Sequence, residues 1–541
     1  MTNNLYLKKI ADTVKSNWIL LLLFFVAAFI VLVFRFPFIH SSYGYDQSVY
    51  IYEGRALSLG EIPYRDVWDQ RPLGIGYIFA FLYKIGFSSL AQFNIFEMFW
   101  IIFTLAVFAY VAKKIVRNGP VVGIGTIYLA FLLVNYVFMG GGNGSVGSTE
   151  GYVEIHLIMP LLLIILGTLM YGKKNNPVWL AVIGISAFAA FMIRATSLDF
   201  LAPPFVYLFF LVKEQRVRQW LKSYSRIVLR VILAFAIPLG AYMIYLAHLG
   251  VLADFYNAIV KFNVYYGSTI PDLKVTNAGI YVKALYSTVN LLQYLPNFPI
   301  SYAVAMLGIV ILFKKIDKLN LFILLFFVFS IINIAVGLKP WPHYFIQIYP
   351  FIALLLCFVI RSVYDNLKPF FEKYGYLNVP LLGIFLLFFV FPYQLKPFIV
   401  SLQKLQSDKT AFDSALRQSP PDPIVEYAKQ HHWSGSRAVY WTNFGEYLET
   451  NMLSSTRYFS NALSDIWEMP SSFATPARVN EVLDDIKNKP PKIIVLNTND
   501  FKYGSLTWSE GSPLRVYVES HFQIEPSLSN GTVLAFVEKQ Q

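Results

Sequence analysis

The apolar residues of this chain gather in runs of about 20 that alternate with short basic stretches. A helix rises about 1.5 Å per residue, so a run of that length crosses the roughly 30 Å hydrocarbon core of a bilayer. The pattern predicts eleven membrane-spanning helices, the first of them retained rather than cleaved as a signal peptide. They cover residues 19–38, 91–112, 119–138, 152–171, 177–193, 198–212, 230–248, 296–313, 319–337, 343–360 and 377–396. The expected fold class is a polytopic α-helical membrane protein.

One further apolar segment, Leu73–Leu90, is short and contains Gly74, Gly76 and Lys84. If it lies at the outer membrane interface, the cytoplasmic loops hold 20 of the 31 Lys and Arg residues before residue 397, in agreement with the positive-inside rule. If it spans the membrane, every later loop changes side and the cytoplasmic count falls to 9. We therefore expect a juxtamembrane amphipathic helix here, a cytoplasmic N-terminus and an extracytoplasmic C-terminal region.

The C-terminal stretch, residues 397–541, differs from the rest because its charged fraction is normal for a water-exposed domain. Its apolar residues form short β-branched and aromatic runs, which are typical of strands. The predicted strands are Arg437–Trp441, Lys492–Leu496, Val516–Glu519 and Val533–Val537, the last entered through a hairpin at Asn530-Gly531. We expect a transmembrane domain over residues 1–396 and a small extracytoplasmic α/β domain over residues 397–541.

The amino-acid composition agrees with a membrane protein and narrows the range of possible functions. Of 541 residues, 56% are hydrophobic and 14% charged, against roughly 25% charged in a soluble domain. The 48 Phe, 36 Tyr and 10 Trp are too many for a disordered chain. The net charge of +12 comes wholly from residues 1–396, where basic loops mark membrane topology, so it does not indicate a nucleic-acid partner.

The first external segment, residues 41–90, is rich in acidic side chains. Asp46 follows the first span by a few residues, so it lies near the membrane surface, where a lipid headgroup would be. Asp46 also precedes a helical stretch as a good N-cap does, and both roles remain open. The other acidic residues of the segment are Glu53, Glu61, Asp66 and Asp69.

The second external loop, residues 139–151, is rich in glycine, which lets backbone approach a ligand closely. Glu150 lies at its end, and Glu154 follows one helical turn later, so both carboxylates share a face at the mouth of the fourth span. Ionisable groups at such a depth usually line a cavity or a pathway. Glu150 equally fits an acid that interacts with a helix N-terminus, and His156 fits a core histidine.

Cations occupy the same side of the predicted membrane. Arg71 precedes Pro72, Arg194 ends the fifth span, and Lys339 begins the connection that leads to His343. Acids and cations at one membrane surface suit a substrate that is both sugar-like and phosphorylated. Each cation by itself also fits an interfacial anchor, because Lys and Arg near span ends extend toward the headgroups.

Taken together, these residues resemble those of membrane glycosyltransferases of the GT-C fold, a group that includes protein O-mannosyltransferases and the bacterial aminoarabinose transferase of lipid A. The resemblance covers the whole chain, including the external C-terminal domain. The residues on which it rests are Asp46, Tyr50, Gly60 to Tyr64, Trp68 to Pro72, Glu150 and His343 to Phe345.

The resemblance implies a donor sugar on a polyprenyl phosphate and a catalytic carboxylate at Asp46, with Glu150 as the second catalytic acid. Asp46 would act as general base on an acceptor hydroxyl, with inversion if the attack is direct; a retaining route stays open. The leaving phosphate needs charge stabilisation, not a general acid. The groups expected at this phosphate are Arg71, Arg194, Lys339 and His343, and those expected at the substrate are Tyr45, Asp69, Glu154 and Tyr344.

A metal cofactor is less well defined. Oxygen ligands at Asp46 and Glu150 are the kind that Mg²⁺ or Mn²⁺ prefers, but two ligands are few. Many relatives have a second acid directly after the first, where this chain has Gln47, and two prolines where it has Pro72-Leu73. The sequence therefore leaves the metal ligands unassigned.

Three other functions compete with a glycosyltransferase. A transporter or flippase of lipid-linked sugars predicts repeated halves, and no repeat is found in the sequence. An envelope polysaccharide polymerase or ligase, which transfers a whole chain, predicts a large external loop between late spans. A receptor that uses its C-terminal domain is the third. The expected location is the plasma membrane of a bacterium, with an external acceptor that is a lipid, a glycan or a protein.

Overall fold

The computed structural model describes residues 2–36, 39, 45–139, 153–213, 216–266, 269–270, 275–276, 299–314, 316–336, 342–374, 422–441, 445–458, 476–497, 511–530 and 532–539. The chain divides into two compact units. The helical unit comprises Met1–His40, Ala91–Ala241 and Gly279–Leu416, and the mixed unit comprises Ser41–Leu90, Tyr242–Ala278 and Arg417–Gln541. The predicted domain boundary at residue 396 lies outside the described residues and stays a prediction.

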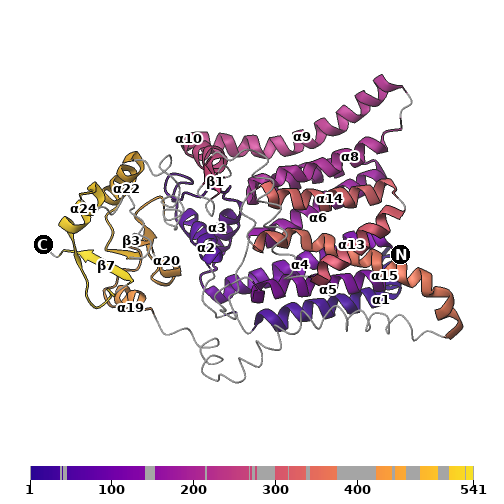
Figure 1. Ribbon diagram of the computed structural model, residues 1–541, viewed down its shortest axis with the longest axis horizontal. Coiled ribbons are helices and arrows are strands. Elements are labelled where there is room, and N and C mark those ends of the chain that lie inside the picture. The colour runs from indigo at the N-terminus through magenta and orange to yellow at the C-terminus, as the bar shows by residue number, and fades with distance from the viewer. Residues whose placement is uncertain are drawn as a thin grey trace. The chain divides into compact units, whose positions relative to one another are not determined.

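The helical unit consists of helices that run alongside one another (Figure 1). In chain order they are α1 (Thr2–Arg35), α4 (Leu90–Val116), α5 (Gly119–Met139), α6 (Val153–Lys174), α7 (Val178–Ile193), η2 (Ala195–Leu201), α8 (Ala202–Leu211), α9 (Val217–His248), α13 (Pro299–Lys314), α14 (Lys318–Val336), η6 (Pro342–Ile348) and α15 (Tyr349–Tyr374). The last residues of α9 belong to the mixed unit.

Five of the described helices are long and apolar enough to cross a membrane, and they match five of the predicted spans. They are Asn17–Arg35, Leu90–Val116, Val153–Lys174, Val217–His248 and His343–Asn366. Shorter apolar helices occupy five more predicted spans, and the eleventh, residues 377–396, lies outside the described residues. The chain is therefore a multi-pass helical membrane protein, and the count of eleven spans stays a prediction.

Small residues let the helices of this unit pack closely. A Cβ added at Gly184 of α7 would lie 2.4 Å from the carbonyl oxygen of Val231 in α9. A Cβ at Gly125 of α5 would lie 2.3 Å from Sγ of Cys357 in α15. Close backbone approach of this kind is how membrane helices gain packing contacts where water does not drive association.

The mixed unit begins with α2 (Tyr45–Ser58) and α3 (Gly74–Lys84), which pack against each other. The approach is close, because a Cβ at Gly54 would lie 2.3 Å from Cβ of Phe79. A helix is thus confirmed within Leu73–Leu90. Its 11 residues rise only about 16 Å, about half the hydrocarbon thickness, so α3 alone does not span a bilayer. Its position at the membrane surface stays a prediction.

Short elements follow in the second stretch of the mixed unit. They are α10 (Leu252–Tyr256), the π-helical turn η3 (Asn257–Phe262), α11 (Asn263–Tyr266), β1 (Thr269–Ile270) and β2 (Val275–Thr276). Strands β1 and β2 pair antiparallel.

The C-terminal stretch of the mixed unit forms a five-stranded mixed sheet in the order β4-β3-β5-β7-β6. The strands are β3 (Arg437–Trp441), β4 (Leu453–Ser454), β5 (Ile493–Asn497), β6 (Phe522–Ile524) and β7 (Val533–Glu538), and the helices are α19 (Pro423–Gln430), α20 (Gly445–Glu449), α22 (Pro476–Asn488) and α24 (Pro513–His521). β3 runs parallel to β4 and β5, whereas β7 runs antiparallel to β5 and β6. The small α/β region is therefore confirmed.

One predicted strand is wrong. Residues Val516–Glu519 lie in helix α24, and the strand follows it at Phe522–Ile524. The physical reason is a helix start just upstream: Ser512 is the N-cap, its hydroxyl accepts a hydrogen bond from the backbone N–H of Arg515, and Pro513 fills the first turn. The strands at β3, β5 and β7 fall where they were predicted.

Candidate active site

One face of α2 presents three polar side chains. Asp46, Tyr50 and Glu53 lie at positions i, i+4 and i+7 of this helix, so they project from the same side. Tyr50 and Glu53 are buried, and Asp46 is half-buried in the first turn. Tyr50 entered the sequence argument only through the resemblance, and Glu53 received no role there. The helical spacing from Asp46 is the signal by which both residues are found.

The loop after α2 brings the carboxylate of Asp69 and the guanidinium of Arg71 to this face. Nη2 of Arg71 lies 2.8 Å from Oδ2 of Asp69, and Nε of Arg71 lies 3.1 Å from Oδ1. Oδ1 also accepts the backbone N–H of Arg71 at 2.8 Å, which closes a tight local turn. Nη1 of Arg71 donates to the hydroxyl of Tyr50, and the guanidinium carbon lies 4.7 Å from the centre of the Tyr50 ring. Asp69 and Arg71, both predicted site residues, are therefore fixed against α2.

Aromatic and polar contacts hold this loop in place. The hydroxyl of Tyr64 accepts hydrogen bonds from the Tyr242 hydroxyl at 3.2 Å and from the backbone N–H of Leu73 at 3.3 Å. Trp68 packs edge-on against Phe262, with the ring centres 5.1 Å apart. A loop held by such contacts loses little further conformational entropy when it binds a ligand.

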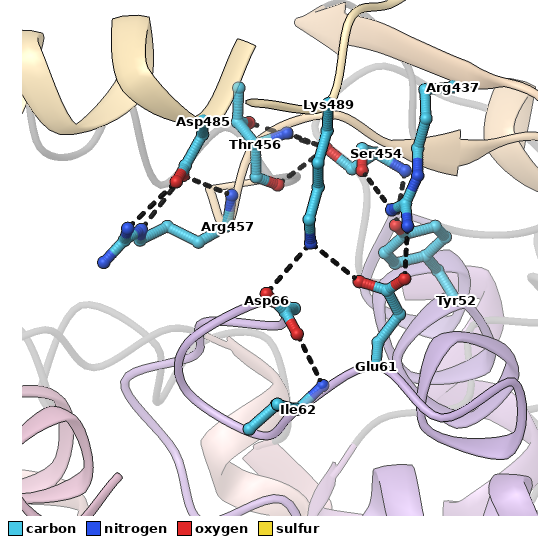
Figure 2. Close-up of polar contacts among 10 residues, drawn as sticks. All are labelled: Tyr52, Glu61, Ile62, Asp66, Arg437, Ser454, Thr456, Arg457, Asp485 and Lys489. Carbon is cyan, nitrogen blue, oxygen red and sulfur yellow. Dashed lines mark hydrogen bonds and ion pairs between the residues drawn. The ribbon is translucent and has the colours of Figure 1, made fainter. Parts of the chain in front are cut away.

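Charged residues from the C-terminal stretch also bind the loop (Figure 2). Nζ of Lys489 lies 3.1 Å from Oε2 of Glu61 and 2.9 Å from Oδ1 of Asp66, while Arg437 pairs with Glu61. The other oxygen of Asp66 accepts the backbone N–H of Ile62 at 2.8 Å. These ion pairs connect the C-terminal sheet region to the segment that leads into Asp69.

Two more hydrogen bonds strengthen this connection. The Tyr52 hydroxyl of α2 accepts the backbone N–H of Ser454 at 2.7 Å (Figure 2). The backbone N–H of Trp68 donates to the carbonyl of Arg457 at 3.1 Å, and the guanidinium of Arg457 is itself held by Asp485 at 2.9 Å. The C-terminal stretch therefore contacts both α2 and the loop that together form this face.

Burial and neighbouring charges set the protonation of the acids. Burial raises the pKa of Asp46; the Arg71 cation opposes this shift and the Asp69 charge adds to it. Burial, Asp69 and a hydrogen bond with Asp69 raise the pKa of Glu53 well above its ordinary value. Burial also acts to raise the pKa of Asp69, but Arg71 and the hydrogen bonds from Glu53 and Arg71 hold it below its ordinary value. Within this pair the proton is therefore favoured on Glu53 and the negative charge on Asp69.

The guanidinium of Arg71 is permanently charged. Burial acts to lower its pKa, but the charges of Asp69 and Asp46 hold it well above the ordinary value. Arginine has five N–H donors, and the bonds to Asp69 and Tyr50 use one on each nitrogen. Among the described residues, one N–H on Nη1 and one on Nη2 have no acceptor.

The helical unit brings together four other predicted site residues. Nη1 of Arg194, between α7 and η2, lies 3.2 Å from Oε1 of Glu154 in α6. The same guanidinium stacks on the ring of Tyr344 in η6, with its carbon 4.2 Å from the ring centre. His343 packs edge-on against Tyr344 at 4.7 Å. This cluster, which we call the Arg194 cluster, thus comprises Glu154, Arg194, His343 and Tyr344.

Sequence reasoning missed two buried charged residues of the same unit, Glu97 and Arg35. Nε2 of His156 lies 2.9 Å from Oε1 of Glu97 in α4, and both side chains are fully buried. His156 is thus a hydrogen-bonded core histidine, one of the roles considered for it. Arg35, at the end of α1, is 4% exposed, and none of the described residues accepts a hydrogen bond from its three guanidinium nitrogens. Ionisable residues inside apolar runs are the signal that finds such groups.

Three predicted site residues are not placed. Glu150 and Lys339 lie outside the described residues, and the side chain of Tyr45, the first residue of α2, is likewise not described. Their expected roles stay predictions.

The described acids do not fit a divalent cation. Among the described residues no group of three or more His, Cys, Asp or Glu side chains converges as metal ligands do. On the α2 face, both oxygens of Asp69 are bound to Arg71, and the raised pKa of Glu53 disfavours its ionised form. A cation there would also meet the charge of Arg71. The predicted oxygen ligands of Mg²⁺ or Mn²⁺ were Asp46 and Glu150, and Glu150 lies outside the described residues, so that site stays a prediction.

Comparison with known proteins identifies the fold. No protein family and no curated protein matches the sequence. Among solved structures, the archaeal oligosaccharyltransferase AglB from Archaeoglobus fulgidus, in complex with an inhibitory peptide and a dolichol-phosphate, matches 97% of this chain and 75% of its own, with a TM-score of 0.54 and 10% identity. ArnT from Cupriavidus metallidurans, bound to undecaprenyl phosphate, matches 95% of this chain and 97% of its own, with a TM-score of 0.52 and 10% identity. The chain therefore shares the fold of these two proteins, which is the GT-C fold that the resemblance predicted.

Proposed function

We propose that this protein is a membrane glycosyltransferase that moves a sugar from a polyprenyl-phosphate donor to the hydroxyl of an extracytoplasmic acceptor. The observation on which this rests is the α2 face, where Asp46 lies within the electrostatic influence of a fixed Asp69–Arg71 pair. The GT-C fold supports it, because both structural neighbours hold a polyprenyl phosphate, dolichol-phosphate in AglB and undecaprenyl phosphate in ArnT.

In the proposed step Asp46 is the general base. Its carboxylate accepts the proton of the acceptor hydroxyl as that oxygen attacks the anomeric carbon of the donor sugar. The bond between the anomeric carbon and the phosphate oxygen breaks, and its electron pair leaves with the polyprenyl phosphate. The products are a glycosylated acceptor, with inverted configuration for direct attack, and the free lipid phosphate. A raised pKa suits Asp46 to this role, because a base works best when its pKa approaches the working pH.

The leaving phosphate gains negative charge during this step. The two remaining N–H groups of Arg71 are suited to bind it, because a guanidinium matches the spacing of phosphate oxygens. In the helical unit, the Arg194 cluster is a second group of this chemistry, with a cation that stacks on Tyr344 and pairs with Glu154. We propose that Arg194 and His343 also bind the phosphate, and that Glu154 and Tyr344 bind the substrate. A plasma-membrane location with the α2 face outside belongs to the same proposal.

Transfer of labelled sugar tests the proposal. Purified protein in nanodiscs is given a panel of synthetic polyprenyl-phosphate sugars and an extract of envelope acceptors, and label in the acceptor and free lipid phosphate are measured. We expect transfer by the wild type and a loss of about 100-fold or more for Asp46→Asn, which keeps the shape but not the base. Asp484→Asn is the matched control, because Asp484 is an exposed acid in α22 of the same unit.

Other outcomes would decide for the competing functions. Protein-dependent movement of the lipid-linked sugar between leaflets of a liposome, without transfer, would indicate a flippase. Release of a whole glycan chain from the lipid would indicate a polymerase or ligase. Transfer that survives Asp46→Asn unchanged would remove Asp46 from the mechanism.

A further inference from the structure

We propose that Glu53 is a positioning residue for the transfer step: its carboxyl donates a hydrogen bond to Asp69 and thereby fixes the Asp69–Arg71 pair against the face of α2 that presents Asp46. This inference rests on the proposed glycosyltransferase function. It assigns a role to a buried acid that neither the sequence motifs nor the chemistry of the step had used.

The position of Glu53 in α2 is tightly confined. Its side chain is 2% exposed and lies one turn from Tyr50, which accepts the Nη1 hydrogen bond of Arg71. Helix α3 covers it, because a Cβ added at Gly76 would lie 3.1 Å from both Cβ and Oε2 of Glu53. Helix α3 thus shields the carboxyl from water. Among the described residues Oε1 of Glu53 has no other hydrogen-bond partner, and Asp69 is the group with which the carboxyl shares a hydrogen bond.

Two buried carboxyls in hydrogen-bond contact cannot both ionise, because the repulsion between like charges in a site without water is too large. Arg71 decides which of them holds the proton. Its guanidinium binds both oxygens of Asp69, so the anion forms at Asp69 and the proton remains on Glu53. The pKa directions agree, with Glu53 raised and Asp69 lowered. Glu53 thus donates a hydrogen bond to Asp69 at the working pH, and Asp69 accepts hydrogen bonds from both Glu53 and Arg71.

The groups that act on Glu53 come from few elements. Among the described residues, the charged groups that act on Glu53 are Asp69 and Arg71 of the loop. Helix α3 presents Gly76 there, and the contact of α20 with α2 runs between Tyr447 and Tyr52. As pH rises through the raised pKa of Glu53, the proton is lost and Glu53 repels Asp69. The added charge also weakens the attraction of Arg71 for a phosphate. We therefore expect activity to fall on the alkaline side of the pH profile through this group.

The test compares two substitutions that differ only in hydrogen bonding. Glu53→Gln has the same shape and its amide donates to Asp69 at every pH, whereas Glu53→Leu donates nothing. We expect Glu53→Gln to keep kcat within about threefold of the wild type and to lose the alkaline fall. Glu53→Leu should lower kcat by about 10- to 100-fold through misplacement of the pair, with a smaller change in KM. Glu446→Gln, at another buried glutamate of the same unit, should change neither kcat nor the pH profile.

A second measurement needs no substrate. Infrared difference spectra of the full-length protein in hydrogen and deuterium buffer should contain a protonated-carboxyl band at neutral pH that Glu53→Gln removes and Glu446→Gln keeps. Two outcomes would overturn the positioning role and leave the glycosyltransferase function intact. One is normal turnover with an alkaline fall that Glu53→Gln does not change, and the other is the absence of the protonated-carboxyl band from the wild type. Absence of turnover with every donor would overturn the proposed function, and the positioning role with it.

Discussion

Lys489 and Asp66 are 423 residues apart in the chain and form an ion pair of 2.9 Å. The same ammonium group binds Glu61 at 3.1 Å, so one lysine of the C-terminal stretch holds both ends of the turn that leads into Asp69. The C-terminal sheet region is thereby part of the support of the candidate active site.

Lys489→Met should therefore affect activity more than stability. The pairs are partly exposed, so the loss of unfolding free energy should be only about 1 kcal/mol. The loop before Asp69 and Arg71 becomes more mobile, and we expect kcat to fall by about 3- to 10-fold through lost alignment. Lys492→Met is the control, because Lys492 pairs with Glu538 in the same unit without touching the loop. Equal activity of the two variants would contradict the supporting role.

The acid side of the pH profile should report Asp46. A general base must be ionised, so kcat/KM should fall as pH falls through the raised pKa of Asp46. The Arg71 cation lowers this pKa, so Arg71→Met should raise it further and move the acid side of the profile to higher pH. Measurement of kcat/KM against pH for both proteins, with Arg515→Met as the control at an exposed arginine, checks the sign. A shift to lower pH in Arg71→Met would exclude Asp46 as the group observed.

The Arg194 cluster allows structural and functional contributions to be separated. Arg194→Met leaves the nearly buried Glu154 without its cation and should lower the free energy of unfolding by about 3–5 kcal/mol. Arg194→Met with Glu154→Met removes both charges and should recover most of that loss. If Arg194 binds the donor phosphate, the double variant still shows a donor KM raised by about 10-fold or more. Thermal unfolding and donor titration check the two expectations, and recovery of wild-type KM would make the cluster purely structural.

The buried guanidinium of Arg35 should lower the free energy of unfolding of the protein. Its guanidinium is buried and has no hydrogen-bond acceptor in the part of the chain that the structure describes, although the charge of Glu97 acts on it. Arg35→Met keeps an unbranched apolar stem of similar length and should raise the free energy of unfolding by roughly 1–3 kcal/mol. Arg361→Met is the control, because Arg361 donates to the carbonyl of Val116 and its loss should destabilise. Tm in the same detergent compares them, and a lower Tm for Arg35→Met would show that the native protein satisfies this charge.

Much of the architecture follows from the sequence because it depends on local pattern. Apolar runs predict the spans, and ten of the eleven correspond to described helices, since a membrane helix satisfies its own backbone hydrogen bonds. The buried strands β3 and β5 were predicted from β-branched and aromatic runs. The spacing of Asp46, Tyr50 and Glu53 on one helix face is equally local, although Glu53 received no role from it.

The tertiary structure decided what depends on contacts between distant residues. Lys489 and Asp66, or Glu154, Arg194 and Tyr344, have no pattern in the chain that pairs them, because complementary charges and rings occur at many positions. Helix α24 shows the same limit at short range, where the cap at Ser512 outweighed the β propensity of Val516 to Glu519. Which buried acid holds a proton depends on three-dimensional charge: Glu53 keeps it because the fold places Arg71 on Asp69.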